Sequence, residues 1–254
     1  MISVVIPTHN RALFLKKAID SVSSQTYQDF ELIVIDDASQ KGPAAARNRG
    51  IKKSTRPFIA FLDSDDRWDK NKLSTQIEEM QKNPDYLISH TQEVWYKNGK
   101  LLNQKKKHKK HHGRIFDKCL SSCVVSMSTV MARREIFDRV GLFDEGLPCC
   151  EDYDFWLRAS INHEFLLIDK PLTLKDGGRP DQVSSIYATG MDKFRIQSLL
   201  KLLKSANLTP DQRDLATREL HKKCRIYGSG CLKHGKREEG QKYLDLPISL
   251  HLGK

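Results

Sequence analysis

The sequence lacks the features that define membrane-spanning and secreted proteins. None of its apolar runs approaches the roughly 20 residues that a helix needs to cross a bilayer. Its apolar start, Ile2–Pro7, is short and has no basic lead, unlike a signal peptide. Its six cysteines show neither paired CxxC spacing nor the density of a disulfide framework. We therefore expect a cytoplasmic protein with reduced thiols, at most peripheral to the inner face of the membrane.

Acidic residues are few relative to basic ones. The chain has 32 Asp and Glu against 43 Lys and Arg, a net charge of +11, and the run Lys105–His112 supplies five of those charges. No aromatic side chains interleave this run, as stacking on single-stranded nucleic acid would require. We interpret the run as a solvated loop that can touch anionic lipid. A basic nucleic-acid-binding protein is the alternative, but we expect no nucleic-acid partner.

Two apolar runs that end in carboxylates are the most informative feature present. The run Leu32–Ile35 leads into Asp36 and Asp37, and Phe58–Leu62 leads into Asp63-Ser64-Asp65-Asp66. Such runs predict strands buried on both faces of a parallel sheet, and ligands bind at the carboxyl ends of these strands. Carboxylates repel a bare phosphate, so the pattern indicates a divalent metal that bridges carboxylate and phosphate. The alternative is that Asp66 or Asp69 caps the next helix, which explains one aspartate but not three.

The spacing of apolar residues predicts an α/β domain with a helical extension. Strands and helices alternate up to residue 85, which is typical of a doubly wound parallel sheet. We expect one domain over 1–190 and a helical appendage over 191–254. The predicted strands are 3–6, 31–35, 57–62, 86–96 and 121–131, and the predicted helices are 11–24, 43–52, 69–82, 134–140, 153–160, 193–203 and one beginning near Pro210.

Two further carboxylates, Glu151 and Asp152, begin the predicted helix that contains Phe155, Trp156 and Leu157. A helix start holds a carboxylate in a fixed orientation at the edge of a cleft, which suits a general base. The alternative is that both carboxylates only complement the helix dipole.

Five segments together resemble the family 2 inverting glycosyltransferases of GT-A fold, over roughly residues 1 to 185. They are Val5–Arg11, Ile35–Ser39, Ala45–Gly50, Phe61–Asp66 and Glu151–Arg158. The resemblance implies a Rossmann-like, mainly parallel sheet flanked by helices, with a nucleotide-binding half (1–85) and an acceptor half (86–190). It also implies roles by position: Pro7, Thr8, His9 and Asp37 hold the nucleotide base, Arg47 assists with the nucleotide, Asp63 lies near the ribose, Asp65 ligates Mn²⁺ or Mg²⁺, and Asp152 is the catalytic base.

The expected activity is transfer of a sugar from a nucleotide-sugar, by the resemblance a UDP-sugar, to a hydroxyl of a glycan, lipid-linked or other cell-envelope acceptor. Inversion needs a base on one side of the anomeric carbon and a cation near the leaving diphosphate on the other. A sugar-phosphate nucleotidyltransferase is a second enzyme alternative. It would call for a Gly-rich, Arg-containing loop after the first strand, where this chain has Pro7–Asn10.

The chain departs from the family's pattern at two places. Only Ala38–Ala44 separates the Asp37 motif from Ala45, where the family carries a further helix and strand, and a parallel crossover needs a dozen or more residues. Either the sheet has lost a strand or a segment is missing between Asp37 and Ala45, and we expect the second. Arg179 stands where the family often has a metal- or phosphate-binding His, so it is either a diphosphate clamp or part of a solvated loop.

Overall fold

The computed structural model describes residues 1–37, 42–97, 99–104, 108–205 and 207–251. The chain forms two compact units, Met1–Ser185 and Ile186–Lys254, which we describe separately. Residues 38–41, on which the expected missing segment falls, lie outside the described residues.

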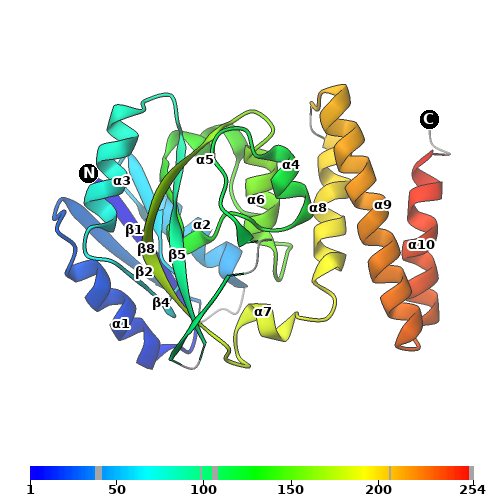
Figure 1. Cartoon of the computed structure of the whole chain (residues 1–254), viewed down its shortest axis with the longest axis horizontal. Coiled ribbons are helices and arrows are strands. Elements are labelled where there is room, and N and C mark those ends of the chain that lie inside the picture. Colours follow the sequence, from blue (N-terminus) through cyan, green and yellow to red (C-terminus); the bar gives the residue numbers. More distant parts are fainter. Residues whose placement is uncertain (38–41, 98, 105–107, 206, 252–254) are drawn as a thin grey trace. The chain divides into compact units, whose positions relative to one another are not determined.

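The first unit is built on a mixed sheet (Figure 1). Its strands follow the order β2-β1-β3-β7-β5-β8-β4, and β6 pairs with β5. The pairs β1–β2, β1–β3 and β5–β8 are parallel, whereas β3–β7, β5–β7 and β4–β8 are antiparallel. The strands are β1 (Ile2–Thr8), β2 (Phe30–Asp36), β3 (Phe58–Phe61), β4 (Asp66–Trp68), β5 (Ile88–Lys97), β6 (Lys100–Leu102), β7 (Met131–Arg133) and β8 (Phe165–Gly177).

Alternating side chains of β1 and β3 cover the two faces of the sheet. Ile2, Val4 and Ile6 join Ala60 in a core with apolar residues of α1 (Ala12–Ser23) and α3 (Lys72–Lys82). On the other face, Phe61 packs edge-on against Phe137 of α5 (Glu135–Val140). Both faces of these strands are thus buried, as predicted for the run Phe58–Leu62. The same prediction is wrong for Leu32–Ile35, because this run forms the edge strand β2, in which Val34 is 38% exposed. The helices α2 (Gly42–Lys53), α4 (Phe116–Ser121) and α6 (Glu151–Ala159) complete this layer, and α7 (Val183–Ile186) ends the unit's chain.

Helix α2 lies unusually close to β1. A Cβ atom on Gly50 would stand 2.3 Å from Cγ1 of Val5, a distance that real Cβ atoms do not adopt. Glycine at this position therefore lets the helix backbone approach the strand. This contact sets the position of the rest of α2, including Arg47, relative to the carboxyl ends of the strands.

Two sequence predictions in the second half of the domain are wrong or incomplete. The segment 121–131 was expected to be a strand, but it contains the end of α4, an irregular stretch and the 3₁₀ helix η2 (Met127–Thr129) before the short strand β7. Ser128 donates a hydrogen bond to the Asp66 carboxylate, and Thr129 donates one to the Ser126 carbonyl. Side-chain hydrogen bonds of this kind compete with the regular pairing of a strand, which explains the irregular backbone. The longest strand, β8, was not predicted, because Asp169, Lys170 and Pro171 interrupt its apolar pattern.

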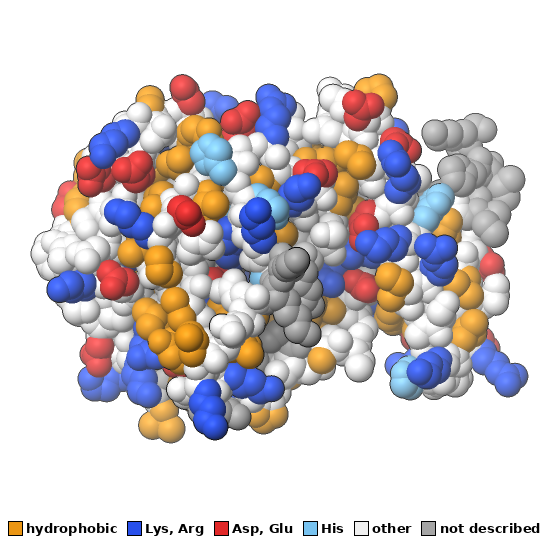
Figure 2. Space-filling view, viewed as in Figure 1, with side chains coloured by type: hydrophobic (Ala, Val, Ile, Leu, Met, Phe, Trp, Pro, Cys, Tyr) orange, Lys and Arg blue, Asp and Glu red, His pale blue; other side chains and the backbone are white. Residues whose placement is uncertain are grey.

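The expectation of a solvated basic loop is wrong for the described part of Lys105–His112. Lys110 is buried, the His108 ring packs against Trp95 with centroids 4.6 Å apart and planes tilted by 52°, and the His111 carbonyl accepts a hydrogen bond from His90. These contacts hold residues 108–112 against β5, while 105–107 lie outside the described residues. Figure 2 shows the remaining basic side chains interspersed with acidic ones over the visible face, rather than gathered in one field.

The second unit consists of α8 (Met191–Ser205), α9 (Pro210–Lys233) and α10 (Arg237–His251). Helix α9 begins as predicted: the Thr209 side chain accepts from the Gln212 backbone, the Gln212 side chain accepts from the Thr209 backbone, and Pro210 occupies the first turn. Among the described helices of the chain, none is long and apolar enough to cross a membrane.

Candidate active site

The three carboxylates after β3 lie in two different environments. Asp66 is buried, and its Oδ2 accepts a 2.6 Å hydrogen bond from Ser128 Oγ, which itself accepts a hydrogen bond from the Asp63 backbone N–H. Asp63 and Asp65 remain partly exposed, at 28% and 19% of the side chain. Asp66 is therefore a structural member of the group, whereas the other two carboxylates can reach a ligand.

Arg47 joins the end of β3 to the start of α6. Its Nη2 donates to Asp63 at 2.8 Å, and its Nη1 donates to Glu151. The guanidinium is nearly fully buried, and the two carboxylates raise the Arg47 pKa although burial opposes the change. The family resemblance implied that Arg47 assists with the nucleotide. The structure instead places both terminal nitrogens on protein carboxylates, and contact with the nucleotide stays a prediction.

Asp65, the expected metal ligand, is bound by the loop that follows β8. Its Oδ2 accepts hydrogen bonds from Arg179 and, at 3.1 Å, from Gln182 Nε2. The Arg179 guanidinium also lies 4.3 Å over the ring of Phe14 in α1. This loop was expected to be either solvated or a phosphate clamp. The structure places Arg179 beside Asp65, where it supplies positive charge, and contact of Arg179 with a phosphate stays a prediction.

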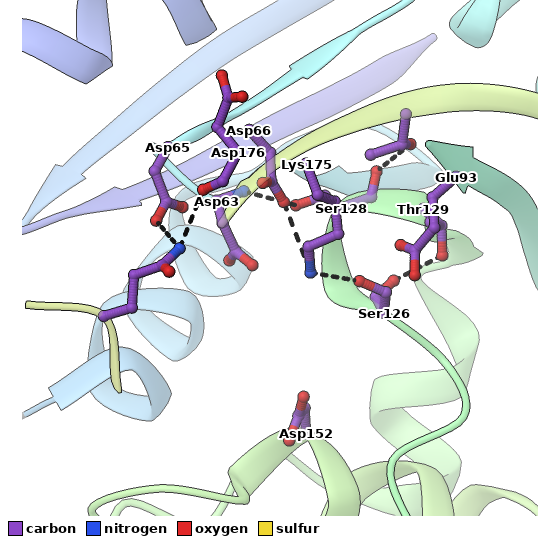
Figure 3. A network of polar contacts seen from close by, with 12 residues as sticks. Asp63, Asp65, Asp66, Glu93, Ser126, Ser128, Thr129, Asp152, Lys175 and Asp176 are labelled. Carbon is purple, nitrogen blue, oxygen red and sulfur yellow. Dashed lines mark hydrogen bonds and ion pairs between the residues drawn. The ribbon is translucent and has the colours of Figure 1, made fainter. Parts of the chain in front are cut away.

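A chain of polar contacts runs from Asp66 across the sheet (Figure 3). Lys175 Nζ lies 2.8 Å from Ser126 Oγ and 3.8 Å from Asp66, at the carboxyl end of β8. Beyond it, Glu93 of β5 pairs with Lys110 at 3.0 Å. Burial alone would raise the pKa of Glu93, but attraction to Lys110 and Lys175 lowers it to about 2, so this carboxylate is ionised.

Asp152 begins α6 on the opposite side of the group. In Figure 3 its carboxylate rises from the helix toward the side on which Asp63 and the Lys175 ammonium lie. Its Oδ2 accepts a hydrogen bond from Cys123 Sγ at 3.2 Å, and its Oδ1 accepts one from the Tyr153 backbone N–H at 2.6 Å. The carboxylate is therefore held from two directions while it remains partly exposed.

The predicted base-binding residues meet at the carboxyl ends of β1 and β2. The Asp37 N–H donates to the Thr8 carbonyl at 2.8 Å, and the Asp37 carboxylate accepts from the Gly42 N–H at 2.6 Å. Pro7 is paired with Ile35 in the parallel register, and His9 is exposed beyond the end of the strand. The two strand ends thus bring Pro7, Thr8, His9 and Asp37 into one region.

The carboxylates of the site outnumber its cationic side chains, which favours binding of a cation. Six carboxylates face four cationic side chains, which leaves two negative charges when all are ionised: Asp63, Asp65, Asp66, Glu93, Glu151 and Asp152 against Arg47, Lys110, Lys175 and Arg179. Burial, together with neighbouring carboxylates, raises the pKa of Asp66 to about 8 and that of Glu151 to about 7. Near pH 7 the excess of negative charge is therefore smaller than two, and a bound cation would favour the ionised form of both carboxyls.

No three His, Cys, Asp or Glu side chains form a metal-binding group among the residues that the structure describes. A closed protein cage is not required, because Mg²⁺ and similar ions in phosphate-transfer sites take one or two carboxylates and fill their shell with water and substrate phosphates. The partly exposed Asp65 fits that role once Arg179 moves away from it. The residues present therefore fit a cation shared with a substrate diphosphate.

Sequence reasoning missed several members of the group. Glu93, Lys110, Cys123, Ser126, Ser128 and Lys175 were not expected at the site. Lys175 was detectable in principle, because it stands at the carboxyl end of β8, where the argument from strand ends would have found it had β8 been predicted. The others lie in a strand interior, in the 3₁₀ helix η2 or in irregular segments, where no local pattern indicates a site.

The family model described as Glycosyl transferase family 2 matches residues 3–42 and 39–141. The two matched segments meet at the short connection after Asp37. Among curated proteins, the chain is 32% identical over 187 residues to the UDP-Glc:alpha-D-GlcNAc-diphosphoundecaprenol beta-1,3-glucosyltransferase WfgD of Escherichia coli, covering 63% of this chain and 69% of that protein. It is 35% identical over 196 residues to an uncharacterized glycosyltransferase of Rickettsia bellii, covering 68% of this chain and 28% of that protein.

The chain covers only 28 to 32% of the length of the relatives from Rickettsia bellii, R. felis and R. conorii. Among solved structures, Staphylococcus aureus TarS 1–349 in complex with UDP-GlcNAc aligns with a TM-score of 0.71 at 20% identity, covering 97% of this chain and 79% of that one. The mannosyltransferase PcManGT of Pyrobaculum calidifontis, in complex with GDP-Man and Mn²⁺, aligns with a TM-score of 0.64 at 13% identity, covering 98% and 75%. These likenesses confirm the predicted GT-A fold with its C-terminal helices.

Proposed function

Since the chain belongs to glycosyl transferase family 2, we propose that it is an inverting, metal-dependent transferase that moves a sugar from a UDP-sugar to an acceptor hydroxyl. The observation that carries this proposal is the placement of Asp152 at the start of α6, opposite the partly exposed Asp63 and Asp65 at the end of β3. A base and a diphosphate-binding end on opposite sides of one site are what displacement with inversion requires.

We assign the donor to the carboxyl ends of β1, β2 and β3. Thr8, His9 and Asp37 would hold the base, with Pro7 shaping the turn, and Asp63 would accept a hydrogen bond from the ribose. UDP and UDP-GlcNAc complexes of TarS, which shares the fold, support a uridine donor. Arg47 would act mainly by holding Asp63 and α6 in place, because its terminal nitrogens already bind Asp63 and Glu151.

A divalent cation, Mn²⁺ or Mg²⁺, would bind at Asp65 and supply positive charge to the leaving diphosphate. Arg179 would leave Asp65 for this to happen, and its planar guanidinium can then face phosphate oxygens. The Mn²⁺ complex of PcManGT supports the choice of metal. Lys175, 30% exposed and held by Ser126, would keep a fixed positive charge between Asp66 and the acceptor side.

Asp152 would accept the proton of the attacking hydroxyl. The hydrogen bonds from Cys123 and from the Tyr153 N–H orient the carboxylate before the acceptor arrives. The acceptor that we favour is a glycan or a lipid-linked sugar of the cell envelope. WfgD, named for a diphosphoundecaprenol-linked acceptor, and AmsB of Erwinia amylovora, named for amylovoran biosynthesis, support that class.

A lipid-linked acceptor would place the enzyme at the inner face of a membrane. We infer that such a contact lies at the β5–β6 hairpin rather than at Lys105–His112, because residues 108–112 pack against β5. Leu101 and Leu102 are 66% and 42% exposed, and Lys97 and Lys100 beside them are exposed. Apolar side chains flanked by lysines fit an anionic lipid surface.

The proposed function is tested by a panel of nucleotide-sugars. UDP-glucose, UDP-GlcNAc, GDP-mannose and the free nucleotides are added to the protein with Mn²⁺ or with EDTA, and thermal stability and binding heat are recorded. We expect one UDP-sugar to stabilise the protein in a Mn²⁺-dependent way, because a ligand that binds only the folded state raises the melting temperature. If none of the nucleotide-sugars stabilises the protein, the proposal is contradicted.

A further inference from the structure

The segment between α4 and β7 bonds to the site at three points. Cys123 Sγ lies 3.2 Å from Asp152 Oδ2, Ser126 Oγ lies 2.8 Å from Lys175 Nζ, and Ser128 Oγ donates to Asp66. One short segment thus contacts the proposed base, the central ammonium and the buried aspartate. Its irregular backbone, which replaces the predicted strand, allows these side chains to face the site.

Cys123 is the member of this segment that contacts the proposed base. Cys123 is partly buried, whereas the other five cysteines are buried. Burial and the neighbouring Asp152 carboxylate raise the pKa of its thiol well above the usual value, so the sulfur carries its proton and can donate it. The Val125 carbonyl is a second acceptor at 3.2 Å. The ionised carboxylate is the stronger acceptor, because hydrogen bonds to charged groups are stronger than those between neutral groups.

On this geometry, and resting on the proposed function, we propose that Cys123 is a positioning residue for Asp152. Its S–H fixes the Oδ2 side of the carboxylate, while the Tyr153 N–H fixes the Oδ1 side. In the transfer step Asp152 takes the proton from the acceptor oxygen as that oxygen bonds to the anomeric carbon and the bond to the diphosphate breaks. The thiol keeps its own proton throughout and forms no covalent bond.

Other charged groups also act on this pair. Arg47 from α2 attracts the Asp152 carboxylate, and Glu151 from the same helix repels it. Lys110 from the basic run acts on the Cys123 thiol. A substitution at Cys123 leaves these three residues in place. A changed pH dependence in a Cys123 variant therefore reports the loss of the hydrogen bond from the thiol to Asp152.

The test compares Cys123→Ala, which removes the donor, with Cys123→Ser, which keeps a donor of similar shape. With the donor sugar saturating, we expect Cys123→Ala to lower kcat by about 10-fold at unchanged donor KM, because a misplaced base costs rate rather than donor affinity. The acidic limb of the pH profile should move to higher pH, since loss of a hydrogen bond that favours the charged form of the base makes that form less favourable. Cys123→Ser should restore most of the lost kcat and most of the change in the pH profile. Cys224→Ala, which replaces a buried cysteine of the second unit, is the control.

A spectroscopic readout keeps this inference separate from the proposed function. The infrared S–H band of Cys123, identified by its loss in Cys123→Ala, should shift to higher wavenumber in Asp152→Asn, because an amide accepts more weakly than a carboxylate. An unshifted band, or a Cys123→Ala enzyme with the parent's kcat and pH profile, would overturn the positioning role. If Asp152→Asn loses turnover while the S–H band does not shift and Cys123→Ala keeps the parent's kinetics, the proposed function stands and this inference is refuted.

Discussion

The Lys110 ammonium lies 3.0 Å from the Glu93 carboxylate, and the two side chains are only 4% and 1% exposed. A buried pair of this kind is costly to break, because the remaining charge is left without a partner. The pair ties the basic run to β5 and forms the far end of the polar network that begins at Asp66. Lys110 is therefore part of the fold, unlike its exposed neighbour Lys109.

Replacing Lys110 with Met should destabilise the protein by about 3 kcal/mol, since Glu93 would stay buried and unpaired. Lys109→Met is the matched control and should change the free energy of unfolding by less than about 0.5 kcal/mol. Urea unfolding at pH 7 measures both variants. Equal stabilities would show that Glu93 finds another partner, for example Lys175, and that the pair is not a structural anchor.

Asp65→Ala should abolish Mn²⁺-dependent binding of UDP, because it removes the partly exposed carboxylate proposed to hold the cation. Arg179→Ala is the informative comparison. Its removal frees Asp65 from its present partner, so Mn²⁺ affinity measured without nucleotide should stay the same or increase. Isothermal titration of both variants decides the matter, and parental metal affinity in Asp65→Ala would show that the ligand lies elsewhere.

Asp152→Asn should retain the affinity for the donor and lose at least about 10²-fold in transfer, the usual scale of a general base. Asp138→Asn makes the same chemical change at an exposed position of α5 and should leave turnover unchanged. Steady-state rates with a saturating donor check this. Parental turnover in Asp152→Asn would remove Asp152 from the mechanism.

The buried His90 should make the fold sensitive to acid. Burial lowers its pKa to about 3 from an ordinary 6.5, and its Nε2 donates to the His111 carbonyl at 2.8 Å. Because the folded pKa is depressed, the unfolded chain takes up a proton below pH 6.5 that the folded chain refuses until about pH 3. Stability is therefore lost as the pH falls through this window, by roughly 2 kcal/mol at pH 5.

His90→Gln, which keeps a donor but does not titrate, should remove this part of the pH dependence. His9→Gln, at an exposed position, should retain it. Urea unfolding of the three proteins at pH 7 and pH 5 provides the comparison. The same loss of stability in parent and His90→Gln would assign the acid sensitivity to other groups, such as His111 and His163, whose pKa values burial also lowers.

The β5–β6 hairpin should carry any binding to anionic membranes. Substituting Leu101 and Leu102 with Ser and Lys97 and Lys100 with Gln should weaken sedimentation with vesicles that contain phosphatidylglycerol, since each lysine near such a surface contributes about 1 kcal/mol. Substituting Lys16 and Lys17 of α1 with Gln is the control for net charge. Equal binding of the hairpin variant and the parent would refute this contact, while binding of UDP should be unaffected in all variants.

Local sequence determined the first half of the domain, in which the parallel strands β1, β2 and β3 are joined by helices. The apolar runs before Asp36 and Asp63 are strands, half-buried at the edge of the sheet in the first case and buried in the second. The turns after β1, β2 and β3 place Thr8, Asp37, Asp63 and Asp65 at one edge of the sheet, because neighbouring parallel strands end on the same side. Asp152 was found in the same way, from two carboxylates at the start of an amphipathic helix. In each case the signal lies within a few residues of the side chain that it predicts.

Only the tertiary structure decided the partners of these side chains. Arg47 reaches Glu151 across 104 positions of the chain, Arg179 reaches Asp65 across 114, and Cys123 reaches Asp152 from a segment expected to be a strand. Lys110, within a run that looks solvated, is buried against Glu93 because β5 passes beneath it. A charge pattern shows which side chains need a partner, but the partner is chosen by which strands and helices pack together, and that contact has no local signature.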